Sequence, residues 1–188
     1  MRPSSARLAA LLLLVGLGVP AGCGYSVVRY GQGIGGAETL AIEPLSNETF
    51  ESGVEMVVLE ALRREALARG GLRLVEDPER ADLVLSGSVR RLSVQPRSFS
   101  SVVLALEYEV GMALQLQAER RGGRTLPIDP RALAETDTYL ASADLEAMRK
   151  NRRETIHRLA SLLSARVFDS LYETAAGAAP EPAGATPP

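Results

Sequence analysis

SVVLALEYEVGMALQLQAE, residues 101–119, alternates apolar side chains with mostly polar or small ones over nearly its whole length. Side chains of a strand point alternately to two faces, so this pattern predicts a strand with one covered face. The other face is then solvated or in contact with a partner. A straight strand would span ~50 Å at ~3.4 Å per residue, well beyond the usual length of about 3–10 residues. We therefore expect a twist or bend, for which Gly111 is the candidate position. The covered set is Val102, Leu104, Leu106, Tyr108, Val110, Met112, Leu114 and Leu116.

A second strand pattern precedes this stretch in ADLVLSGSVRRLSVQP, residues 81–96. One extra residue in a strand, a β-bulge, reverses the phase of every side chain that follows it. We therefore expect a bulge near Arg90 and Arg91 that keeps the apolar residues of both halves on the inner side. The two halves have opposite phase, with Leu83, Leu85 and Val89 in the first and Leu92 and Val94 in the second.

Shorter strands are predicted around these two. Thr39–Leu45 and residues 72–76 are apolar runs bounded by turn residues. After the long strand, ERRGGR predicts a turn. Residues 125–141 then predict a return strand that Pro127 and Pro130 interrupt, because proline cannot donate to a sheet.

Two helices are predicted by apolar residues at the spacing i, i+3, i+4 and i+7. The first begins at Ser52, which with Glu55 fits the S-x-x-E capping box, and it ends at the Gly70-Gly71 pair. The second runs from Ser142, as its cap, to about Tyr172. Their apolar faces comprise Val54, Val57, Val58, Ala61 and Leu62, and Ile156, Leu159, Ala160, Leu163, Val167 and Leu171.

This order of elements predicts an α+β fold. We expect a two-layer sandwich, with two amphipathic helices packed on one face of a mostly antiparallel sheet of four to five strands. Residues 38–174 would form this single domain, a usual size for one core. Residues 175–188, rich in alanine, proline and glycine, predict a disordered tail.

The N-terminus has the pattern of an export signal. Arg2 and Arg7 precede an uncharged apolar run that is shorter than the roughly 20 residues of a membrane-spanning helix. Ala21-Gly22 before Cys23 resembles the lipobox of bacterial lipoproteins, with proline in place of the usual leucine. The resemblance implies a signal peptide over residues 1–22, lipid on Cys23 and, because no aspartate follows, location in the outer membrane.

The glycines after Cys23 match G-x-G-x-x-G at Gly31, Gly33 and Gly36. A dinucleotide-binding turn requires a helix after the glycines, whereas the following residues predict a strand. We therefore interpret residues 23–37 as a lipidated N-terminus and a Gly-rich linker, and we expect no cofactor.

Composition excludes several classes of function. Residues 1–22 contain two of the 21 basic residues and none of the 23 acidic ones, so the mature chain is mildly acidic, which argues against nucleic acid as a partner. Cys23 is the only cysteine and His157 the only histidine, which leaves a Cys/His metal site or nucleophile incomplete. Glu107 and Glu109 are best interpreted as a solvated strand face. We expect neither an enzyme nor a metal protein.

The outline resembles the lipopolysaccharide-assembly lipoprotein family, LptE, over nearly the whole mature chain. The resemblance rests on CGY at residues 23–25, the strand–SNET–helix passage, ADLVLSGSV, the Glu107-Tyr108 pair of LEYEV, and NRRETIHRLA. It implies a lipoprotein that sits in the lumen of the outer-membrane barrel LptD, which it plugs and supports. It also implies binding of lipopolysaccharide on its way to the cell surface.

Arginines at strand ends are the candidate ligands for lipopolysaccharide phosphate, because the guanidinium fork pairs bidentately with phosphate. Arg97, after the strand-breaking Pro96, is the first candidate and Arg91 the second. The remaining candidates are Arg90, Arg120, Arg121 and Arg124. For each of them, an ordinary solvated loop arginine is the alternative. The basic residues between Arg149 and Arg153 are interpreted as a solvated helix face.

A different lipoprotein family is the main alternative. TLAIEPLSNET followed by a helix also resembles the opening of LpoB/CsgG-type lipoproteins, which activate a peptidoglycan synthase or form a secretion pore. Those folds place more helix between their strands. The uninterrupted strand pattern from Asp82 to Gln117 therefore favours the first family.

Overall fold

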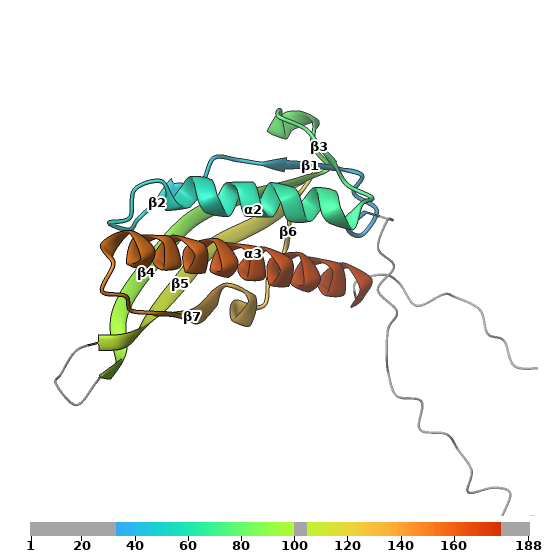
Figure 1. Ribbon diagram of the computed structural model, residues 1–188. Coiled ribbons are helices and arrows are strands. Elements are labelled where there is room, and N and C mark those ends of the chain that lie inside the picture. Colours follow the sequence, from blue (N-terminus) through green and yellow to red (C-terminus); the bar gives the residue numbers. More distant parts are fainter. Residues whose placement is uncertain (1–32, 100–104, 178–188) are drawn as a thin grey trace, which may run out of the picture.

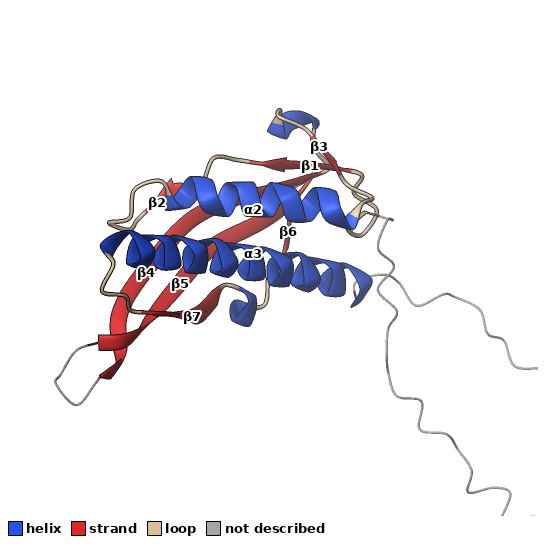
Figure 2. Cartoon of the chain, in the orientation of Figure 1, coloured by secondary structure: helices blue, strands red, loops and turns tan. Residues whose placement is uncertain are grey.

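A computed structural model describes residues 33–99 and 105–177 of the chain. Two helices lie side by side across one face of a curved sheet, which gives the two layers expected from the sequence (Figure 1). Because both helices lie on the same face, neither of the two described α-helices covers the opposite face of the sheet (Figure 2). Cys23, the signal peptide, the first part of the linker and the strand positions Val102 and Leu104 lie outside the described residues, as does the tail from residue 178.

The sheet has seven strands rather than four to five, and its pairing is mixed. Antiparallel pairing joins β4 to β5, and β5 to both β6 and β7, whereas β1 pairs in parallel with β3 and β4, and β2 with β4. The chain returns through a helix between β1 and β3, and such a crossover joins parallel strands. The strands are β1 (Thr39–Ile42), β2 (Ser46–Asn47), β3 (Arg73–Leu74), β4 (Leu83–Phe99), β5 (Ala105–Arg120), β6 (Arg124–Leu126) and β7 (Ala134–Leu140).

The helices are α2 (Val54–Arg69) and α3 (Leu145–Gly177), and both predicted caps are wrong. Gly53, with a φ of 82°, occupies the cap position of α2 and makes no side-chain cap bond. The Glu55 carboxylate instead accepts a hydrogen bond from the side chain of Asn47, at 2.7 Å. At α3 the Asp144 carboxylate accepts from the Glu146 N–H at 2.9 Å, in place of Ser142. The predicted end of α2 at Gly70 is confirmed.

The predicted bulge is present, because the register of β4 against β5 shifts between Val89 and Arg91. It turns Leu92 toward the core, where this side chain is half-buried, but Val94 stays 38% exposed. Pairing is continuous through Gly111, so the bend predicted at that glycine is absent. Two of the three irregularities of the long hairpin lie on β4, at Arg90 and Arg97, and the third lies on β5, at Leu106. The Pro-interrupted return strand is confirmed as β6 and β7, separated by a short 3₁₀ helix (Pro130–Ala132).

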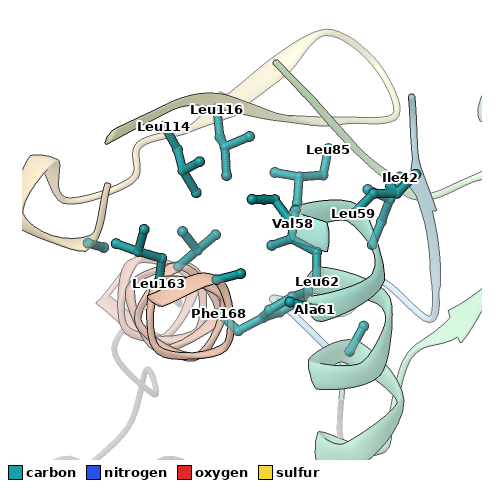
Figure 3. Close-up of a cluster of buried hydrophobic side chains, with 14 of the residues drawn as sticks. Ile42, Val58, Leu59, Ala61, Leu62, Leu85, Leu114, Leu116, Leu163 and Phe168 are labelled. Atoms are coloured by element: carbon teal, nitrogen blue, oxygen red, sulfur yellow. The ribbon is translucent and has the colours of Figure 1, made fainter. Parts of the chain in front are cut away.

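The core lies between the helices and the inner face of the sheet (Figure 3). In β5 the predicted alternation holds from Val110 to Leu116, where every even-numbered side chain is buried, and it continues to the buried Ala118. It ends at Tyr108, whose ring stacks on Tyr139 with 5.3 Å between the centroids. Leu106, the next residue of the predicted set, is 51% exposed because the hairpin continues beyond the helices (Figure 1). The inner face is therefore covered over only part of the strand.

Candidate functional site

The six predicted arginines lie at three separate places along β4 and β5. Arg97 is near the hairpin end, where Pro96 pairs with Tyr108 and Ser98 with Glu107, so that Arg97 itself is left out of the register. Its side chain is exposed and makes no hydrogen bond or ion pair with another described residue. The break expected at Pro96 is absent, because β4 continues to Phe99, and the irregularity lies at Arg97 itself. Among the described residues, this guanidinium is therefore available to an external anion.

Apolar side chains surround this hairpin end. Phe99 is 55% exposed, and Val94, Leu106 and Leu140 are also exposed. Leu140 of β7 pairs with Glu107, so it lies beside the same part of β5. Isolated exposed apolar residues are common, but a group of them at one end of a molecule is typical of a contact surface.

Arg90 and Arg91 lie at the bulge, in the middle of the sheet. Arg90 forms an ion pair with Glu48, 3.1 Å away, and donates to the Gln115 side chain, so its guanidinium already has partners within the protein. Arg91 is exposed opposite Ala113 and lies at a shallow hollow of about 430 Å³ on the outer face of the sheet.

The outer hollow beside Arg91 also carries negative charge. It is lined by Glu109 and Glu135 as well as by Ser93 and Thr136. Glu135 pairs in register with the buried Met112, and its carboxylate forms an ion pair with Arg166 of α3, so its charge lies on the helix side of the sheet. The N–H of Thr136 and the Arg166 guanidinium both hold the pKa of Glu135 below its usual value. Glu109, which accepts from the Gln95 side chain, is the carboxylate on the outer face, and only the side of Arg91 away from it is favourable for an anion.

Arg120, Arg121 and Arg124 lie at the opposite end of β5, where Arg120 pairs with Arg124 across the turn. Arg121 donates to the carbonyl oxygens of Arg80 and Ala81, and its guanidinium is 3.4 Å from the Asp82 carboxylate.

Asp82 also ties β4 to the start of β1. It accepts from the Thr39 hydroxyl at 2.7 Å and from the N–H groups of Thr39 and Glu38, at 3.0 and 3.1 Å. These hydrogen bonds, with the hydroxyl contributing most, lower the pKa of the Asp82 carboxyl. Arg121 therefore contributes to the junction between β4 and the start of β1 more than to ligand binding.

The strand separates the predicted arginines. From Tyr108, beside Arg97, to Arg120 is up to about 40 Å at ~3.4 Å per residue, and from Tyr108 to Ala113, beside Arg91, is about 17 Å. One phosphate cannot contact these three groups together. Arg97 and Arg91 can contact different anionic groups of one large ligand.

The outer face of the sheet is lined by small and polar side chains. In register, Ser93 faces Gly111, which in turn faces Thr136, so three neighbouring strands present almost no side-chain bulk there. Gln115 and Gln117 continue the polar surface along β5 and are exposed. A flat polar face of this kind, which the helices do not cover, can lie against a polar surface of a partner.

Sequence reasoning missed a cavity of about 440 Å³ between the start of α2 and the first half of α3. Arg149, Arg152, Arg153 and His157 contribute to its lining together with Ile156. The spacing could have revealed it, because these five residues follow i, i+3, i+4, i+7 and i+8 and continue the apolar stripe of α3 toward its N-terminus. The sequence pattern predicted a solvated face for the three arginines instead.

Chemistry-bearing groups are few in the described part of the chain. No group of three or more His, Cys, Asp or Glu side chains that could hold a metal ion occurs among residues 33–99 and 105–177. None of the helices in these ranges combines the length and the apolar character needed to cross a membrane. The residues after Gly36 form β1 and not a helix, which agrees with the rejection of a dinucleotide-binding turn.

Comparison with known proteins gives one family. The family model LptE, described as "Lipopolysaccharide-assembly", matches residues 37–171. No curated protein matches the chain.

Solved structures show the same fold. The crystal structure of the rare lipoprotein B from Shewanella oneidensis aligns with a TM-score of 0.52 at 16% identity, over 74% of this chain and 98% of that one. The solution structure of an uncharacterized lipoprotein B from Nitrosomonas europaea aligns with a TM-score of 0.50 at 12% identity, over 82% and 92%. At these identities the likeness shows a shared fold.

Proposed function

Because the chain belongs to LptE, a family of lipopolysaccharide-assembly lipoproteins that are not enzymes, we propose that it plugs and supports an LptD-type outer-membrane barrel. The observation that carries this proposal is the outer face of the sheet, which is small, polar and free of helices. The lumen of a membrane barrel is polar and can enclose such a face, whereas an apolar face would be required against lipid.

The proposal includes attachment to the outer membrane through lipid on Cys23, so that the domain faces the periplasm or lies within the barrel lumen. One acyl chain gives only marginal binding at about 0.8 kcal/mol per buried CH₂, so stable attachment needs two or more chains. The Ala21-Gly22-Cys23 sequence supports processing at this point.

Lipopolysaccharide is the proposed ligand, with Arg97 contacting one phosphate and Arg91 a second anionic group. Arg97 is exposed and unpaired among the described residues, and Phe99 beside it offers apolar surface to an acyl chain or to the barrel wall. The LpoB/CsgG-type function, as a peptidoglycan-synthase activator or secretion component, is the alternative.

Affinity capture of the chain from detergent-solubilised native outer membranes should recover an outer-membrane barrel in a one-to-one ratio, because the open polar face needs a polar enclosure. The intact mass of the captured chain should show acylated Cys23 as its first residue. The matched control is the same tag on an unrelated outer-membrane lipoprotein. Recovery of peptidoglycan synthases without a barrel would favour the alternative function.

Replacing Arg97 and Arg91 together by glutamate should weaken lipopolysaccharide binding at least tenfold. Charge-assisted hydrogen bonds contribute about 1.5–3 kcal/mol each, and about 1.4 kcal/mol is a tenfold change in affinity. Binding is measured by isothermal titration calorimetry, with circular dichroism as the folding control.

The double variant Arg63→Glu with Arg64→Glu is the matched control, because it makes the same change of charge at exposed positions on α2. Equal losses in the two double variants would indicate a general charge effect. Unchanged affinity in a folded Arg97/Arg91 variant would assign both residues to the solvated surface.

A further inference from the structure

The cavity between α2 and α3 combines basic and apolar walls. Its volume of about 440 Å³ lies within the range of small-molecule sites, about 300–1,000 Å³. The apolar wall comes from Val54 and Val57 of α2 and Ile156 of α3, of which Val54 and Ile156 are buried in the core. The basic wall comes from the first turns of α3.

One arginine of the basic wall is fixed by the protein itself. Arg152 donates through both terminal nitrogens to the two carboxylate oxygens of Glu51, at 2.9 and 2.6 Å. This bidentate pair joins the loop before α2 to α3 and raises the pKa of Arg152. Glu51 therefore cannot neutralise the other cations of the cavity.

The other basic groups keep donors available. Arg149 donates to Glu146 through one nitrogen, in a pair exposed to solvent, which is weak and easily exchanged. Arg153 and His157 lie one turn apart on α3, and neither side chain makes a hydrogen bond or ion pair with another residue in the described ranges. The unpaired Arg153 and the weakly paired Arg149, beside an apolar wall, are the complement of an amphiphilic anion.

We propose that this cavity binds a phosphate monoester that carries a short apolar substituent. Arg153 and Arg149 hold the phosphate oxygens and His157 lies beside them, while the substituent lies on Val54, Val57 and Ile156. Phosphate fits better than carboxylate because its two negative charges match two guanidinium forks. The cavity is in the helix layer, away from Arg97 and from the outer face of the sheet, so this site goes beyond the proposed function and does not depend on it.

Titration with hexyl phosphate tests the site in the purified full-length chain, in a non-ionic detergent. His157 is the only histidine, so its ring C–H signals in ¹H NMR report on this cavity without assignment of the rest of the spectrum. We expect a saturable shift of these signals. Inorganic phosphate should bind more weakly than hexyl phosphate, and hexanol should cause no saturable shift.

The variant Arg149→Gln with Arg153→Gln should weaken hexyl phosphate binding at least tenfold. The matched control is Lys150→Gln, which removes a charge from the same turns of α3 but lies outside the cavity, where Lys150 is 3.8 Å from Glu154. It should bind with an affinity within about twofold of the unmodified chain. Circular dichroism checks that each variant is folded, and Arg153→Lys, which keeps the charge, should retain part of the affinity.

Three results would overturn the proposal. The first is unchanged binding in the folded double variant, and the second is an equal loss in Lys150→Gln, which would reveal a diffuse charge effect. The third is equal affinity for inorganic phosphate and hexyl phosphate, which would show that the apolar wall takes no part. None of these results bears on capture of the barrel or on Arg97, so the two proposals fail separately.

Discussion

Replacing Gly87 by alanine should disrupt the pairing of β4 with β5 and destabilise the whole domain. A Cβ at this position would lie 1.9 Å from the carbonyl oxygen of Gln115 and 2.9 Å from the Cα of Leu116, both backbone atoms of the facing strand. The φ of Gly87 is also 149°, a conformation that side chains disfavour. Overpacking and backbone strain each cost about 1–3 kcal/mol, so we expect a loss on the order of 4 kcal/mol.

Such a loss is a large part of the roughly 5–15 kcal/mol that stabilises a typical domain. Urea unfolding followed by far-UV circular dichroism measures it as a lower midpoint. Gly111→Ala is the matched control on the same pair of strands. Its Cβ would lie 2.9 Å from the Ser93 hydroxyl oxygen, which can rotate away, and 3.5 Å from the Thr136 methyl group, an ordinary contact. A midpoint for Gly87→Ala as high as that for Gly111→Ala would contradict the expected clash.

Phe168→Ala should lower the free energy of unfolding by about 3–5 kcal/mol, the usual cost of removing a buried aromatic side chain. Phe168 is fully buried on α3 and points toward Leu62 and Ala61 of α2 (Figure 3). The Arg69 guanidinium also lies 6.0 Å from its ring centroid. The substitution therefore leaves a cavity at the junction of both helices and removes a cation–π contact.

The matched control for Phe168→Ala is Phe50→Ala, in which the same atoms are removed from a fully exposed side chain. Its free energy of unfolding should stay within about 0.5 kcal/mol of the unmodified chain. Urea unfolding at pH 7 measures both variants. Similar losses at the two positions would mean that packing of Phe168 does not hold the two helices together.

The repeat of apolar residues predicted those strands and helices in which the buried face depends only on the sequence of the segment itself. The even-numbered residues from Val110 to Leu116 are buried as expected, because each side chain of a strand faces the same layer as the residue two positions on. The phase reversal around Arg90 located the bulge for the same reason. Gly70 ended α2 as predicted, since a residue with positive φ there favours glycine.

β3 lies within the strand predicted at residues 72–76, whereas β2 and the parallel pairing of both strands escaped prediction. β2 contains two residues, too few for a period to be visible, and the pairing of β3 with β1 depends on where α2 returns the chain. The cap of α2 was also missed, because the side chain that bonds Glu55 belongs to Asn47 in the preceding strand.

In the candidate site, too, some features could be predicted from the sequence and others could not. The exposure of Arg97 could be predicted, because proline in a strand is typical of an irregular position, although the residue left out of the register is Arg97 and not Pro96. The ion pair between Arg90 and Glu48 could not be predicted, since β2 must first lie beside β4 to bring the two side chains together.

The sequence by itself determined the two-layer α+β class, the helix faces and the polar outer side of the sheet, because each follows from a period of 2 or 3.6 residues along one segment. The tertiary structure alone decided where the helix layer stops, which leaves Leu106 exposed although its pattern is that of a core residue. It also decided that Arg152 meets Glu51 and that the neighbouring basic residues line a cavity. Those contacts join segments about a hundred residues apart, and only packing sets the distance between such segments.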